Sequence, residues 1–120
     1  MENEMDNEHK VTVERMFAAS AKGDIEEFLS YLTDDVTWTI IGDESLIGKE
    51  AIRQFMLPCT DTPTFTVEKI IAEGEVAMGH GNMEMKDKDG IIQPYAYCDI
   101  YQFNNDKVSK MTTFVTQTNT

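Results

Sequence analysis

The first half of the chain places apolar residues at a helical period. Val13, Met16 and Phe17 lie three and four residues apart, which predicts a helix over about residues 9–21. Gly23 follows the last periodic position, and a glycine there is typical of a helix end. We therefore expect an amphipathic helix that packs one face on the rest of the protein.

Two more helices are predicted before the middle of the chain. Asp24, with Glu27 three residues later, resembles a capping box at a helix start. The β-branched and aromatic segment 36–41 then predicts a short strand, and residues 49–56 return to helical spacing. The apolar stripes of these two helices contain Ile25, Phe28, Leu29 and Leu32, and then Ala51, Ile52, Phe55 and Met56.

The second half of the chain predicts strands joined by short turns, which must be antiparallel. The expected strands are 65–73, 76–86, 91–104 and 107–116. Helices followed by such a meander indicate the α+β class. We expect one domain over residues 9–120, preceded by a disordered acidic tail over residues 1–8.

Composition narrows the class of partner. The 120 residues carry a formal net charge of -12, which disfavours binding to nucleic acid and to anionic membranes. No apolar run approaches the roughly 20 residues of a membrane span, and the acidic start does not resemble a signal peptide. Cys59 and Cys98 are expected to be free thiols in the cytoplasm. No metal or cofactor motif is recognised, so neither is expected.

Three segments, 23–38, 48–55 and 99–114, resemble the nuclear transport factor 2-like superfamily and its SnoaL-like and ketosteroid isomerase-like group. The resemblance implies a cone-shaped fold, in which N-terminal helices pack on a curved, mostly antiparallel sheet and enclose a pocket. It also implies a homodimer that forms through the outer sheet face. On the strand 91–104 this face would carry Ile92, Ala96, Cys98 and Ile100.

The resemblance to ketosteroid isomerases carries over only in part. By this resemblance the general-base aspartate falls on Ile40, the oxyanion-hole tyrosine on Met16 and a supporting tyrosine on Met56. The protonated oxyanion-hole aspartate falls on Asp99. Because isoleucine cannot accept a proton, a true ketosteroid isomerase is excluded.

Two other enzyme patterns of the superfamily are not matched. SnoaL-like cyclases use a carboxylate near the end of the last strand, whereas residues 114–116 here contain no acid. Limonene epoxide hydrolase needs an Asp-Arg-Asp set. The two arginines, Arg15 and Arg53, both fall on predicted helices.

Asp99 is the unusual residue of the strand 91–104. It shares one face with Tyr97 and Tyr101, because strand side chains alternate. A two-residue hairpin turn at Asp89-Gly90 would place His80 directly opposite Asp99. Such a pair can transfer protons near neutral pH, or it can simply satisfy two buried polar groups. Both interpretations stay open.

We therefore predict a small-molecule pocket protein, which, if it is an enzyme, is a cofactor-free isomerase, cyclase or dehydratase. It would act by proton transfer on a compact apolar carbonyl or hydroxyl compound. The alternatives are a non-catalytic binding module, or a homodimeric association domain with a vestigial pocket. The candidate catalytic residues are His80 and Asp99. The candidate ligand-binding residues are Met16, Trp38, Ile40, Met56, Met78, Asn82, Tyr97, Tyr101, Met111 and Thr113.

Overall fold

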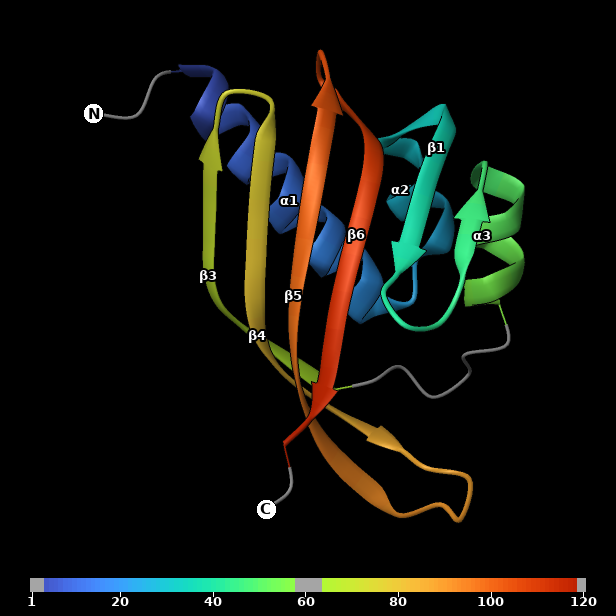
Figure 1. Ribbon diagram of the computed structural model, residues 1–120. Helices are drawn as coiled ribbons and strands as arrows, with labels where there is room; N and C mark the ends of the chain where they lie inside the picture. Colours follow the sequence, from blue (N-terminus) through green and yellow to red (C-terminus); the bar gives the residue numbers. More distant parts are fainter. Residues whose placement is uncertain (1–3, 58–63, 119–120) are drawn as a thin grey trace.

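Three helices lie on one face of a six-stranded sheet (Figure 1). The computed structural model describes residues 4–57 and 64–118. The helices are α1 (Glu4–Lys22), α2 (Ile25–Ser30) and α3 (Lys49–Met56). The strands are β1 (Leu32–Ile40), β2 (Ser45–Ile47), β3 (Thr64–Glu73), β4 (Val76–Lys86), β5 (Ile92–Asn104) and β6 (Lys107–Gln117). The predicted α+β class is confirmed.

The first helix begins earlier than its apolar pattern indicates. Residues 4–8 are helical, so the expected disordered tail over residues 1–8 is wrong for this part, and residues 1–3 lie outside the described range. Asp6 accepts a hydrogen bond from the backbone N–H of Gly74 at 2.8 Å. The ring nitrogens of His9 lie 2.8 Å from the Gly74 carbonyl oxygen and 3.0 Å from that of Asn105. His9 also stacks on Phe103, with ring centroids 3.8 Å apart. These long-range contacts hold the helix start.

The ends of the next two helices follow the local sequence. Asp24 caps α2, and its carboxylate accepts a hydrogen bond from the backbone N–H of Glu27 at 3.1 Å. The bounds of α3 are those that the apolar spacing predicts. Leu32, expected in the stripe of α2, is instead the first residue of β1. The three-residue strand β2 was not predicted.

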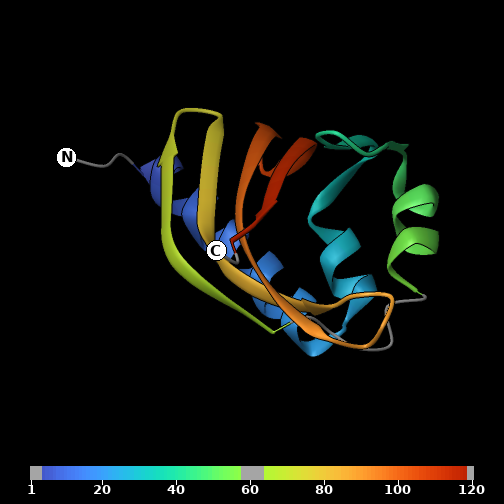
Figure 2. The same ribbon diagram turned by 60° about the horizontal axis from the view of Figure 1, so that its bottom comes forward.

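The sheet has the strand order β2-β1-β6-β5-β4-β3. Strands β3 to β6 form the expected antiparallel meander, and β1 runs parallel to β6 at its edge. The sheet is strongly curved and does not close. The far end of the β4–β5 hairpin bends toward the side of α2 and α3 (Figure 2).

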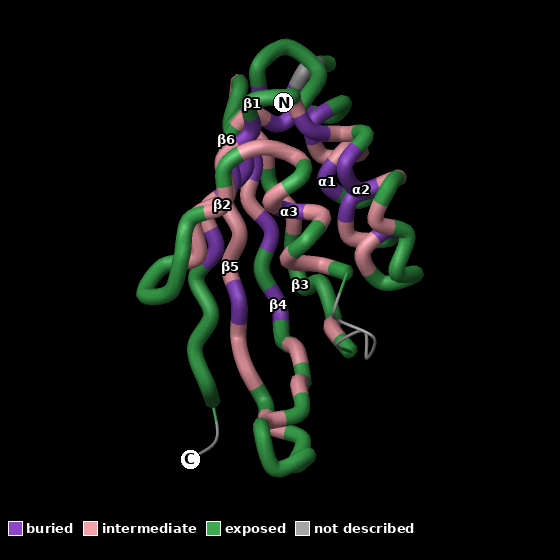
Figure 3. Tube along the Cα trace, turned by 90° about the vertical axis from the view of Figure 1, so that its right-hand side faces the viewer, coloured by how far each residue is buried: buried purple, intermediate pink, exposed green. Residues whose placement is uncertain are grey.

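The core lies between the helices and the inner face of the sheet, where most buried positions cluster (Figure 3). Helix α1 contributes Val13, Met16 and Ala19 to it, and none of these side chains is exposed. The facing strand β5 contributes Tyr101 and Phe103. The outer face of the sheet has no helix over it (Figure 1).

The loop between β4 and β5 corrects the expected register. Asp87 and Ile91 close the hairpin, since the N–H of Asp87 donates to the Ile91 carbonyl oxygen at 2.9 Å. The loop therefore has three residues, 88–90, and Gly90 adopts a φ of 79°, which a residue with a side chain rarely adopts. The predicted two-residue turn is wrong by one residue.

The one additional residue in the loop shifts every residue pair between β4 and β5 by one position from the predicted register. His80 pairs with Cys98, and Asp99 pairs with Gly79. Because strand side chains alternate, a one-residue shift sends each side chain of β4 to the other face relative to β5. The side chains of His80 and Asp99 therefore lie on opposite faces of the sheet.

Candidate functional site

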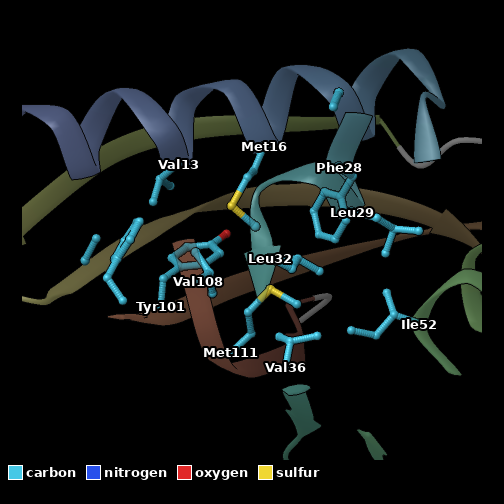
Figure 4. Close-up of a cluster of buried hydrophobic side chains, with 13 residues drawn as sticks. Val13, Met16, Phe28, Leu29, Leu32, Val36, Ile52, Tyr101, Val108 and Met111 are labelled. Carbon is cyan, nitrogen blue, oxygen red and sulfur yellow. The ribbon is translucent and has the colours of Figure 1, made fainter. Parts of the chain in front are cut away.

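A cavity of about 90 Å³ lies between the helices and the inner face of the sheet. Figure 4 shows Met16 reaching from α1 toward Tyr101 and Met111, with Phe28 beside it. The lining residues are Met16, Phe17, Ser20, Phe28, Trp38, Met56, Asp99, Tyr101, Met111 and Thr113. Most of this wall is apolar, and its polar atoms are concentrated around Asp99.

Asp99 sits at the centre of a hydrogen-bond network in the cavity wall. Tyr101 donates its hydroxyl hydrogen to Oδ2 of Asp99 at 3.2 Å, and the Thr113 hydroxyl also bonds this carboxyl group. Trp38 in turn donates its indole N–H to the Thr113 oxygen at 2.8 Å. Strands β1, β5 and β6 each supply a member, so the sheet itself positions the carboxyl group.

Burial dominates the electrostatics of this carboxyl group. Removal from water raises the pKa of Asp99 to about 6, although the hydrogen bonds from Thr113 and Tyr101 act in the opposite direction. Burial also raises the pKa of Tyr101 well above 10, and the neighbouring charge of Asp99 adds to this effect. Tyr101 therefore stays protonated as a donor, while Asp99 changes its charge close to neutral pH.

This arrangement can exchange a proton with a small molecule. A carboxyl group with a pKa near the working pH is present in both forms, which general acid–base catalysis requires. Among the described residues, the cavity wall holds one carboxyl group and no Lys, Arg or His. The described residues also contain no group of three or more His, Cys, Asp or Glu side chains that could hold a metal ion.

The sequence model of the SnoaL-like domain matches residues 13–111. The chain belongs to the SnoaL-like domain family. The match covers the helical residues that line the cavity and the strand β5, which carries Asp99 and Tyr101. A comparison with curated proteins gives no match.

Solved structures share the fold of this SnoaL-like domain. An NTF2-like protein of unknown function from Cytophaga hutchinsonii has 24% identity and a TM-score of 0.75, over 90% of this chain and 99% of that one. A protein from Jannaschia sp. assigned to the SnoaL-like polyketide cyclases has 12% identity and a TM-score of 0.85, over 96% and 90%. An epoxide hydrolase from M. tuberculosis, described as LEH-like, has 12% identity and a TM-score of 0.81, over 92% and 84%. At these identities the likeness shows the fold.

The SnoaL-like domain brings most of the sequence-predicted residues to the cavity. Besides Asp99, the predicted residues that line it are Met16, Trp38, Met56, Tyr101, Met111 and Thr113. Ile40 pairs with Thr113 at the sheet but does not line the cavity. Tyr97 is buried on the inner face, where its hydroxyl donates to the Thr66 carbonyl oxygen at 2.8 Å.

Three predicted residues of β4 lie away from the cavity. His80, Met78 and Asn82 share the outer face, because the three-residue loop shifts the register. The ring of His80 is exposed, and its Nδ1 lies 3.8 Å from a carboxylate oxygen of Glu68. The predicted contact between His80 and Asp99 is therefore wrong.

Three lining residues of the SnoaL-like domain were not predicted. Phe17 and Phe28 belong to the apolar stripes of α1 and α2, and the sequence pattern gave them only a core role. Ser20 lies four residues after Met16, so it shares the same side of α1. That spacing could have identified Ser20 as a polar group that faces the cavity. No helix in the described part of the chain is long and apolar enough to span a membrane.

Proposed function

We propose that this SnoaL-like domain binds a compact, mostly apolar carbonyl or hydroxyl compound and transfers a proton within it through Asp99. The reaction would need no cofactor and would be an isomerisation, a cyclisation or a dehydration. The observation that carries this proposal is a single carboxyl group, with a pKa of about 6, in the wall of a mostly apolar cavity.

The neighbours of Asp99 suit this role. Ionised Asp99 would accept a proton from the ligand, and the protonated form would return it at another atom. Tyr101 and Thr113 hold the carboxyl group in place in the meantime. The side chains of Met16, Met56 and Met111 can adapt to ligands of different shape, because methionine is flexible and polarisable.

The likeness in fold supports small-molecule chemistry as the general class. The neighbours include an epoxide hydrolase and a protein assigned to the polyketide cyclases. Fold alone does not define activity. The proposal for this chain therefore depends on Asp99 and its surroundings.

The proposed reaction can be tested with 4-hydroxybutan-2-one, a compact probe that carries both functional groups. Asp99 would remove a proton from the carbon between them. It would then donate that proton to the hydroxyl oxygen, which leaves as water. NMR in deuterated water would follow deuterium uptake at this carbon and the formation of butenone. Wild-type protein should accelerate at least one process, and Asp99→Asn should abolish the acceleration. Equal rates in both proteins would contradict the proposal.

A non-catalytic binding module is the second candidate. The cavity, at about 90 Å³, is smaller than the roughly 300 Å³ at which ordinary ligand pockets begin. Among the described residues of the cavity wall, Asp99 also has no Lys, Arg, His or second carboxyl group beside it that could share the proton transfer. If the probe binds near Asp99 but neither process accelerates, this candidate replaces the enzyme.

We further propose that the outer sheet face forms a homodimer. Ile92, Ala96, Cys98 and Ile100 lie on this face of β5. A groove of about 540 Å³ there also includes Ile41 and Phe114, of which Ile41 is 50% exposed and Phe114 is 43% exposed. An uncovered apolar sheet face favours association. Light scattering at micromolar concentration should give twice the chain mass, and Phe114→Glu should reduce it to the monomer. A wild-type monomer would end this proposal.

In the third candidate, the protein is only an association domain, with the dimer as its function and the cavity vestigial. It predicts a dimer together with no response of Asp99 to any small probe. We also propose a cytoplasmic location, which the free thiol of Cys98 supports. Cys59 lies outside the described residues. Fractionation of cells would test the location.

A further inference from the structure

The hydrogen-bond donors around Asp99 already make hydrogen bonds within the protein. Tyr101 and Thr113 both direct their hydroxyl hydrogens at the Asp99 carboxyl group. The indole N–H of Trp38 is directed at the Thr113 oxygen. Each of these residues has one polar hydrogen, so none has a second to offer. While Asp99 is ionised, the sheet side of the cavity therefore has no free donor for a ligand.

The acceptor atoms around Asp99, unlike the donors, still have unused lone pairs. An ionised carboxylate has about four lone-pair sites, and the two hydroxyl groups use two of them. The Tyr101 oxygen also keeps a free lone pair after it donates. Ser20 is the remaining hydroxyl group of the wall, and it lies across the cavity on α1. A ligand that reaches Asp99 thus meets unused acceptors.

We propose that the natural ligand of this cavity presents a hydrogen-bond donor to the Asp99 carboxylate, which makes it a compact alcohol or protonated amine and not a compound whose only polar group is a carbonyl. This inference rests on the proposed function, since it assumes that a small molecule binds at Asp99. Of the two classes considered there it favours hydroxyl compounds, and it adds protonated amines, because both offer a donor to the free acceptors and a carbonyl group does not.

No positive side chain competes for this carboxylate. Among the described residues the cavity wall contains no Lys, Arg or His. The other titratable group in the wall, Tyr101, remains a neutral donor. Next to Asp99 on β5, Tyr97 and Cys98 have raised pKa values, so both are neutral at pH 7. A donor from the ligand would therefore supply the interaction that the ionised carboxylate lacks.

The cavity also limits the size of the ligand. Its volume of about 90 Å³ is enough for several water molecules. Movement of the three methionine side chains would enlarge it further. Probes with four carbon atoms and one polar atom are thus a suitable starting size.

Three matched probes test the inference: butan-2-ol, butan-2-one and protonated butan-2-amine. They share one carbon skeleton and differ in the group offered to Asp99. Binding would be measured by NMR titration at about pH 5 and about pH 7.5, on either side of the pKa of Asp99. Over this range the ionised fraction of Asp99 rises about tenfold.

A donor ligand should bind up to about tenfold more tightly at the higher pH, because it prefers the ionised carboxylate. The same ligand should lower the pKa of Asp99, followed by its carboxyl carbon signal. Asp99→Asn should remove this pH dependence. The carbon signal tests the inference in the wild-type protein, so it does not depend on how the variant folds. The relative affinities of the alcohol and the amine would identify the natural source of the donor.

Two results would overturn the inference, and they are distinguishable. If butan-2-one binds most tightly, gains affinity at low pH and raises the pKa of Asp99, the ligand is an acceptor and only the inference fails. If none of the probes changes the Asp99 signal at saturating concentration, the small-molecule site itself fails, and the proposed function fails with it.

Discussion

Asp99 and Cys98 are neighbours on β5, yet they lie in two different environments. Asp99 faces the inner cavity, where three side chains form a continuous hydrogen-bond network around it. Cys98 faces the outer groove, opposite the exposed His80. Burial, with the charge of Asp99, raises the pKa of the Cys98 thiol, so it stays protonated and is a poor nucleophile.

The difference shows how one strand supports two kinds of surface. On the inner face, a buried polar group costs free energy unless it is hydrogen-bonded, and Asp99 is bonded by Tyr101 of its own strand and Thr113 of the neighbouring strand β6. On the outer face, apolar groups are left half-exposed beside charged ones, which suits association more than chemistry. The two histidines follow the same logic. His9 is buried and bonded, whereas His80 is exposed.

The largest expected effect comes from Gly81→Ala on the inner face. A Cβ at this position would overlap the backbone carbonyl oxygen of Thr66 on β3. Because a backbone atom cannot move aside without breaking the ladder, the free energy of unfolding should fall by about 3 kcal/mol or more. Urea denaturation would measure it. The control on the outer face, Asn82→Ala, should lower it by less than about 0.5 kcal/mol. Similar losses of unfolding free energy in the two variants would contradict the difference between the inner and outer faces.

The two histidines provide the next test. His9→Ala removes the contacts of the ring nitrogens with the carbonyl oxygens of Gly74 and Asn105 and the stack on Phe103, so it should cost about 2–3 kcal/mol of unfolding free energy. His80→Ala should cost less than about 0.5 kcal/mol, because its ring is exposed. It should also leave the affinity of the cavity for butan-2-ol unchanged. A loss of that affinity would show that His80 contributes to ligand binding.

Asp99→Asn should stabilise the protein above pH 6. The pKa of Asp99 is about 6 in the folded state and about 3.9 in an unfolded chain, so the folded state binds more protons between these values. Stability due to this group is therefore lost as the pH rises from about 4 to about 6. The variant avoids this loss and should be more stable by about 1–2 kcal/mol at pH 7.5. Below about pH 4 the difference should vanish. A constant difference across this range would contradict the assignment.

Tyr101→Phe gives the smallest effect and tests the network directly. Loss of the Tyr101 hydroxyl removes a donor to the carboxylate, so the pKa of Asp99 should rise from about 6 to about 7. The carboxyl carbon signal of Asp99 would report it. The matched control is Tyr97→Phe, because the Tyr97 hydroxyl donates to Thr66 and not to Asp99. A similar rise in the control would argue against a specific network.

Local signals in the sequence were enough to locate most elements. The bounds of α3 and β4 agree with the predicted ones, because each has a clear period and a stop beside it. The odd-numbered face of β5 was also identified as the inner face, since Asp99 and Tyr101 line the cavity. The sequence could not show the role of His9, whose partners lie 65 and 96 residues away.

The predicted register between β4 and β5 was wrong for a different reason. The Asp89-Gly90 dipeptide is typical of a two-residue turn. However, the Asp87 carboxylate accepts hydrogen bonds from the N–H groups of Asp89 and Ile91, at 2.9 and 3.0 Å. These bonds stabilise the longer loop. An aspartate two residues before Asp89 was the available signal, since such side chains commonly bond to the backbone two residues on.

The same loop has a consequence for the evolution of the family. Substitutions alter a pocket one side chain at a time, whereas an insertion or deletion of one residue between Asp87 and Ile91 would re-pair all 11 residues of β4 with β5. Such an event would exchange inward and outward side chains and would present His80 to the cavity. Among relatives of this fold, loop length in the hairpin should therefore be compared before residue identity when active sites are aligned.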